Sequence, residues 1–209
     1  MRRGSAGATA LIPSAHDFFS SSRGRTPTVR RRGVMSAARG RVVLSHGMDS
    51  GPQAVKIGAL ADVARQLGWN PLLPDYRDLD AQGLAAAAAP RLARLLALIA
   101  DGVPCVLAGS SFGACVSGLA SLQSAPRGLF LLATPPLIPG FAQPFALREG
   151  VPACLVHGWR DTLCPVEAAF DLARRYRAEL LLLDDDHRLS SQVQPIADHF
   201  RHFLARIAA

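Results

Sequence analysis

Short apolar segments alternate with segments of helical periodicity over most of this chain, beginning at Arg41. Near-continuous apolar runs between helices are typical of strands in a parallel sheet that is covered on both faces. Right-handed crossovers between such strands give a doubly wound order, and ligands then bind at the carboxyl ends of the strands. The sequence therefore predicts an α/β fold with a doubly wound, mostly parallel sheet of about six strands and helices on both faces.

The predicted strands and helices follow one another in alternation. Strands are expected at residues 41–46, 70–74, 104–108, 128–133, 151–157 and 179–183. Helices are expected at residues 53–67, 81–100, 112–123, 165–177 and from about residue 190 onward. The second of these helices is rich in alanine and leucine, and its charged residues Arg91 and Arg94 are expected to point outward.

The pentapeptide Gly109-Ser110-Ser111-Phe112-Gly113 has the form G-x-S-x-G and joins a predicted strand to a predicted helix. A turn this tight leaves no room for side chains two residues before and after the central serine, which explains the two glycines. The hydroxyl of Ser111 would then project from the sheet, with the N–H groups of the new helix directed toward it. This context is typical of a nucleophile elbow.

Two further residues with suitable chemistry follow predicted strands. A free serine hydroxyl is a weak nucleophile and needs a base within hydrogen-bond reach, a role that suits His187. Asp161, just beyond the fifth strand, would fix the histidine tautomer and stabilise the imidazolium.

The sequence leaves open a second candidate for the carboxylate that orients the histidine. The run Asp184–Asp186 directly precedes the histidine and could supply the carboxylate instead, although it is otherwise expected to be a solvated strand end. His157, before the predicted acid, is expected to be packed or to brace a loop.

From about residue 41 to 208 the chain resembles a small α/β-hydrolase. The resemblance rests on His46-Gly47 after the first strand, the G-x-S-x-G elbow, the H-G-x-x-D turn ending at Asp161, and Asp186-His187 before the last helix. It is most similar to the short, lidless serine esterases of the YqiA-like and dienelactone-hydrolase-like kind. Dienelactone hydrolases proper resemble it less, because their nucleophile is a cysteine and position 111 here is serine.

The resemblance implies a serine hydrolase that cleaves carboxylic esters or thioesters through an acyl-enzyme intermediate, with a Ser-Asp-His triad and without a cofactor. The backbone N–H groups of Met48 and Phe112 would form the oxyanion hole, and His46 would support that loop without carrying protons. A catalytically quiet binding protein on the same scaffold is the alternative, since a fold does not imply a function. His199 and His202 share a helix face but lack an H-E-x-x-H context, so no metal site is expected.

The interval between the fourth and fifth strands is too short for a cap domain. Residues 135–150 can form only a loop or a short helix there, so the serine is expected to be fairly open. The apolar side chains of this segment could line an acyl pocket together with Met48 and Phe112, or could instead cover the edge of the sheet; they are Leu137, Ile138, Phe141 and Phe145.

The first 34 residues differ from the rest in composition. They carry seven arginines and a single acid, Asp17, and so account for most of the net charge of +7. Nucleic-acid binding by the remaining chain is therefore not indicated. Three interpretations of residues 1–34 compete: a transit-type segment, a disordered basic arm, or a stretch that precedes a true start at Met35. The hydrolase domain is expected to span residues 35–209.

The cysteines and the hydropathy pattern indicate a cellular compartment. Four cysteines without close pairing stand mostly in apolar surroundings, which favours small buried side chains in a reducing compartment; Cys164 is the least clear, because it falls in a predicted active-site loop. Neither a secretory signal nor a membrane-spanning stretch is recognisable. We therefore expect a cytoplasmic protein whose partner is a small-molecule ester or thioester.

Overall fold

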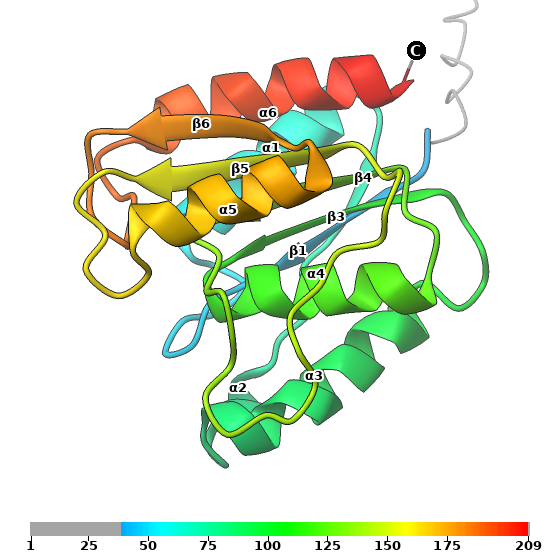
Figure 1. Ribbon diagram of the computed structural model, residues 1–209. Coiled ribbons are helices and arrows are strands. Elements are labelled where there is room, and N and C mark those ends of the chain that lie inside the picture. The colour runs from blue at the N-terminus through cyan, green and yellow to red at the C-terminus, as the bar shows by residue number, and fades with distance from the viewer. Residues whose placement is uncertain (1–38, 209) are drawn as a thin grey trace, which may run out of the picture. The chain divides into compact units, whose positions relative to one another are not determined.

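Six parallel strands form one sheet at the centre of the fold (Figure 1), in the part of the chain that the computed structural model describes, residues 39–208. The strand order is β2-β1-β3-β4-β5-β6. The strands are β1 (Arg41–Ser45), β2 (Asn70–Leu72), β3 (Cys105–Ser110), β4 (Gly128–Leu132), β5 (Ala153–Gly158) and β6 (Glu179–Leu183). The predicted doubly wound parallel sheet is confirmed.

Helices cover both faces of the sheet, as predicted. They are α1 (Val55–Gln66), α2 (Arg77–Asp80), α3 (Leu84–Leu98), α4 (Phe112–Gln123), α5 (Val166–Tyr176) and α6 (Val193–Ala208). Helices α1 and α6 pack on one face, and α3, α4 and α5 pack on the other (Figure 1). Each face carries its own cluster of buried apolar side chains, so the sheet separates two hydrophobic cores.

Strand β1 shows how one strand serves both cores. Val42 and Leu44 belong to the core under α1 and α6, whereas Val43 belongs to the core under α3 and α4. All three side chains are fully buried. Successive side chains of a strand point to opposite faces, so a strand covered on both sides reads as a continuous apolar run.

The predicted element boundaries differ from the structure mainly between β2 and α3. Strand β2 ends at Leu72, and the short helix α2 follows where the sequence indicated only a connection. The next helix begins at Leu84 because Gly83 has a positive φ of 87°, which ends the preceding turn. Residues 135–150 form neither helix nor strand, consistent with the expected absence of a cap domain.

The tail expected at residues 1–34 lies outside the described residues. Within residues 39–208, no helix is both long and apolar enough to cross a membrane.

Candidate active site

Ser111 occupies a strained turn between β3 and α4. Its φ of 55° and ψ of −121° are values that residues other than glycine rarely adopt. A Cβ at Gly109 would lie 2.3 Å from the carbonyl oxygen of Gly113, and a Cβ at Gly113 would lie 2.1 Å from that of Ser45. The turn can therefore close against β1 only with glycine at both positions.

A continuous chain of hydrogen bonds joins the three side chains predicted to form the triad. Ser111 Oγ lies 2.8 Å from His187 Nε2, and His187 Nδ1 lies 2.8 Å from Asp161 Oδ2. The Asp161 side chain is fully buried, and that of His187 is 15% exposed. The residues come from the carboxyl ends of β3, β5 and β6, which the parallel topology brings to one edge of the sheet.

The loop after β5 fixes the orientation of the Asp161 carboxylate. Its Oδ1 accepts hydrogen bonds from the backbone N–H groups of Leu163, at 3.0 Å, and Cys164, at 2.8 Å. His157 Nε2 lies 3.3 Å from Asp161 Oδ2 and donates a hydrogen bond of 2.7 Å to the Cys164 carbonyl. The bracing role predicted for His157 matches this placement. Oδ2 is thereby left facing His187.

The neighbouring aspartates are occupied elsewhere. Asp185 Oδ2 accepts hydrogen bonds from the N–H and hydroxyl of Ser191, and Asp186 Oδ1 accepts one from the N–H of Arg188. Asp184 pairs with a neighbouring arginine side chain. The expectation of a solvated strand end is wrong for Asp185, which is 6% exposed. Burial alone would raise the pKa of Asp185, but the hydrogen bonds it accepts lower that pKa overall.

Of the two residues predicted to form the oxyanion hole, Phe112 directly follows Ser111 and Met48 lines the same cavity as the serine. Phe112 is the first residue of α4, and the N–H groups of a helix's first turn have no acceptor within the helix. Met48 lies in the turn after β1, and it lines the same cavity as Ser111. Anionic oxygen is favoured at such a helix N-terminus.

His46 supports the Met48 loop through both ring nitrogens. Nε2 accepts a hydrogen bond of 3.0 Å from the Tyr76 N–H, and Nδ1 donates one of 2.8 Å to the Gly47 carbonyl. The side chain is fully buried, and burial lowers its pKa below the ordinary value of 6.5. The lowered pKa favours the neutral imidazole, which is the form that both hydrogen bonds require.

Arg91 is buried, so its predicted outward position is wrong. It is fully enclosed, and its guanidinium pairs with Asp80 and with main-chain carbonyls of the loop after β1. The helical period could have predicted this burial, because position 91 shares a face of α3 with the buried residues 87, 88, 92 and 95. Arg94 is 36% exposed and pairs with Asp78 at 2.7 Å.

A cavity of about 430 Å³ contains Ser111 and His187. Its walls come from the loop after β1, the start of α1 and the loops carrying the triad; they are Gly47, Met48, Asp49, Ser50, Ala54, Lys56, Ile57, Ser110, Ser111, Leu163, His187 and Arg188. Leu163 is 74% exposed and gives the rim an apolar side chain. Lys56 donates a hydrogen bond to the Arg188 carbonyl, which ties α1 to the histidine loop.

The four apolar residues predicted to line an acyl pocket do not line this cavity. Ile138 is buried in the core under α3 and α4, and Phe141 and Phe145 pack against that core. Leu137 is 57% exposed. Three of the four pack against the helices instead of lining a pocket, because the segment after β4 turns toward α3 and α4 (Figure 1).

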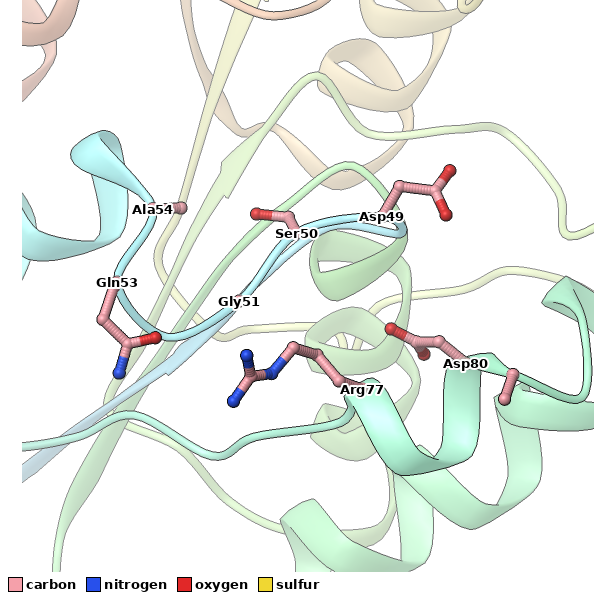
Figure 2. Close-up of a pocket in the computed structure, with 8 residues that line it drawn as sticks. Asp49, Ser50, Gly51, Gln53, Ala54, Arg77 and Asp80 are labelled. Carbon is pink, nitrogen blue, oxygen red and sulfur yellow. The ribbon is translucent and has the colours of Figure 1, made fainter.

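A second hollow, of about 530 Å³, lies next to the first. Figure 2 shows Arg77 and Asp80 of the α2 segment reaching toward the loop that carries Asp49 and Ser50. The two hollows share Asp49, Ser50 and Ala54, but neither Ser111 nor His187 lines the second. Ser111 and His187 therefore open onto the first cavity and not onto the second.

Two groups of three side chains within residues 39–208 bring potential metal-ligand atoms within 4.8 Å of one another. The first, Asp161, Cys164 and His187, is part of the hydrogen-bond network described above. In the second, which also includes Cys154, the carboxylate of Glu179 already pairs with His199 and with an arginine. Burial raises the pKa of the Cys164 thiol to about 12, so that it is a poor nucleophile and a poor ligand.

The chain is similar in structure and sequence to a protein of Xanthomonas campestris pv. campestris that is assigned to the hydrolases of the alpha/beta superfamily. The two are 39% identical with a TM-score of 0.76, over 80% of this chain and 99% of that one. No family model matches the chain, and no curated protein sequence does.

More distant structures share the fold. Est1E from Butyrivibrio proteoclasticus is 15% identical with a TM-score of 0.66, over 82% of this chain and 89% of that one. Alpha/beta hydrolase domain-containing protein 10 from mouse is 16% identical with a TM-score of 0.64, over 80% of this chain and 90% of that one. The 39% identity to the Xanthomonas protein shows that the chain belongs to the alpha/beta hydrolase superfamily, and that relationship supports a hydrolase in general.

Proposed function

We propose that this protein is a serine hydrolase that cleaves carboxylic esters or thioesters through an acyl-enzyme intermediate. The observation that carries the proposal is the unbroken chain of hydrogen bonds from Ser111 through His187 to Asp161. Nucleophile, base and orienting acid are each within hydrogen-bond reach of the next, which is the arrangement that an activated serine needs.

The hydrogen-bond pattern supports one placement of the protons, because a carboxylate can only accept. His187 Nδ1–H donates to Asp161, so the lone pair of Nε2 faces the Ser111 hydroxyl and accepts its proton. As the hydroxyl oxygen bonds to the acyl carbon, the proton moves to Nε2 and the carbonyl oxygen becomes an oxyanion. The buried carboxylate stabilises the imidazolium that forms.

The oxyanion would lie between the N–H groups of Met48 and Phe112. Collapse of the tetrahedral intermediate expels the alcohol or thiol, which takes the proton from His187 Nε2. Water then repeats the sequence on the acyl-serine and releases the carboxylic acid. Each donor of an oxyanion hole is worth about 10²–10³ in rate.

Covalent labelling by a fluorophosphonate probe tests the proposal. We expect the wild-type protein to be labelled and Ser111→Ala to be unlabelled, with Ser110→Ala, the adjacent serine, as the matched control that retains labelling. A wild-type protein that is folded but neither labelled nor active on any p-nitrophenyl ester or acyl thioester of a chain-length series would favour a catalytically quiet binding protein instead.

A further inference from the structure

Arg91 occupies an unusual environment for a charged side chain. It is fully buried, and its guanidinium lies between the aromatic rings of Tyr76 and Phe112, with the central carbon 4.6 Å and 4.4 Å from the two ring centres. Nε donates a hydrogen bond of 2.6 Å to Asp80 Oδ1, and a terminal nitrogen contacts the second oxygen. The charge is therefore neutralised and held in a fixed plane.

The remaining donors of the guanidinium hold the loop after β1. Nη1 donates a hydrogen bond of 2.8 Å to the His46 carbonyl, and Nη2 lies 3.3 Å from the Gly47 carbonyl. The Gly47 carbonyl also accepts the hydrogen bond of 2.8 Å from His46 Nδ1. Two donors thus fix the direction of a single carbonyl group.

That carbonyl belongs to the same peptide group as the N–H of Met48. In a trans peptide the C=O and N–H bonds point in opposite directions. Because Arg91 holds the Gly47 oxygen, the Met48 N–H points away from Arg91. Met48 lines the same cavity as Ser111, so this N–H belongs to the wall in which an oxyanion donor is needed. Donors to the carbonyl also polarise the peptide, which makes its N–H a stronger donor.

We infer that Arg91 is a positioning residue that orients the Met48 peptide as an oxyanion-hole donor; the inference rests on the proposed hydrolase function. Stability alone does not call for a charge at this position, since a well-packed apolar pair in place of Arg91 and Asp80 avoids the desolvation of two ions. A fork of donors does what an apolar side chain cannot, because it sets the angle of a peptide group.

The experiment compares Arg91→Lys and the double variant Arg91→Met/Asp80→Asn with the wild type. Lysine keeps the charge opposite Asp80 but loses the planar fork, and the double variant avoids leaving a buried carboxylate unpaired. Arg94→Met is the matched control, because Arg94 also anchors the residue 75–78 segment from α3 but does not contact the loop after β1. Ser111→Ala is measured beside them.

The readouts are kcat and KM on a p-nitrophenyl ester, inhibition by a trifluoromethyl ketone, and thermal unfolding. For both Arg91 variants we expect kcat to fall about 10- to 100-fold with KM within about twofold, because one oxyanion donor is misdirected but not removed. Inhibition should weaken in parallel, since the ketone forms an oxyanion on Ser111. Arg94→Met should retain wild-type kcat.

Unchanged kcat and inhibition in both folded Arg91 variants would overturn the inference and reduce Arg91 to a structural residue, even if unfolding temperatures fell. Should Arg91→Lys fail to fold, the double variant decides by the same readouts. A wild-type protein whose turnover does not differ from that of Ser111→Ala would overturn the proposed function itself, and the inference with it.

Discussion

Replacement of Asp161 by asparagine keeps the shape of the side chain and removes only its charge and one acceptor. Oδ1 of Asp161 accepts the N–H groups of Leu163 and Cys164, and the amide oxygen can keep both bonds. The flipped amide would lose both, at about 1 kcal/mol each plus the cost of burying unpaired N–H groups. The unflipped amide therefore predominates and presents its NH₂ to His187 Nδ1.

The direction of this NH₂ determines the histidine tautomer. Because the amide donates, Nδ1 of His187 must accept, and its proton moves to Nε2, where Ser111 needs an acceptor. The corresponding change in the chymotrypsin-like triad lowers kcat about 10⁴-fold. In this open site we expect kcat to fall about 10³–10⁴-fold, which corresponds to about 4–5.5 kcal/mol of lost transition-state stabilisation. Thermal stability should fall far less than activity.

The assay is kcat on a short p-nitrophenyl ester together with thermal unfolding. Asp184→Asn and Asp186→Asn are the matched controls, because their carboxylates bond to an arginine and to a backbone N–H and not to His187. Both should retain activity within about threefold. A folded Asp161→Asn protein with near wild-type kcat, beside an inactive variant at 184, 185 or 186, would refute the assignment of the acid.

Three further predictions follow from the geometry of the site. Gly113→Ala would place a methyl group 2.1 Å from the Ser45 carbonyl oxygen and should cost about 3 kcal/mol or more of unfolding free energy, measured by urea denaturation. Ser111→Gly should abolish turnover yet raise stability by about 1 kcal/mol, because glycine accepts the positive φ; a lower urea midpoint would contradict this. Burial holds the pKa of His46 below 6.5, so the unfolded chain binds a proton that the folded chain does not, and stability should decline as pH falls below about 6.5. The unfolding temperature of His46→Gln should change less than that of the wild type between pH 7.5 and 5, and parallel curves would exclude His46 as the source.

The elbow could be predicted from the sequence because its constraints are local. A strand that turns this sharply into a helix needs the two glycines around Ser111. The five consecutive residues 109–113 therefore suffice to predict the turn. The positions of Asp161 and His187 followed from the same logic, since the carboxyl ends of parallel strands meet at one edge. Strand alternation therefore placed Asp161 and His187 at the same edge as Ser111, but it left Asp184–Asp186 open as a second source of the acid. Only the partners of these carboxylates in the structure distinguish the two sources.

Strand alternation does not predict the cavity walls or the contacts of Arg91, and the helical period of α3 indicated only that position 91 lies on the buried face. The partners of Arg91 include two main-chain carbonyls from a loop over forty residues away. Every residue has such a carbonyl, so residue identities cannot predict these contacts. The segment after β4 was apolar enough for either a pocket or a core, and only its path over α3 and α4 decides. Long-range packing, not local propensity, determines both outcomes.

The strand order has a consequence for how activity arises as the chain is made. After β1 and β2, each later strand adds to the same growing side of the sheet in the order of synthesis, and β6 arrives last as the edge strand. The nucleophile turn belongs to the third strand, whereas His187 follows the sixth. Domains generally fold from the N-terminal side during translation. On the proposed mechanism, a nascent chain can thus fold β1 to β5 around a Ser111 hydroxyl that is still inert, and the serine gains its base only when β6 docks and brings His187 beside it.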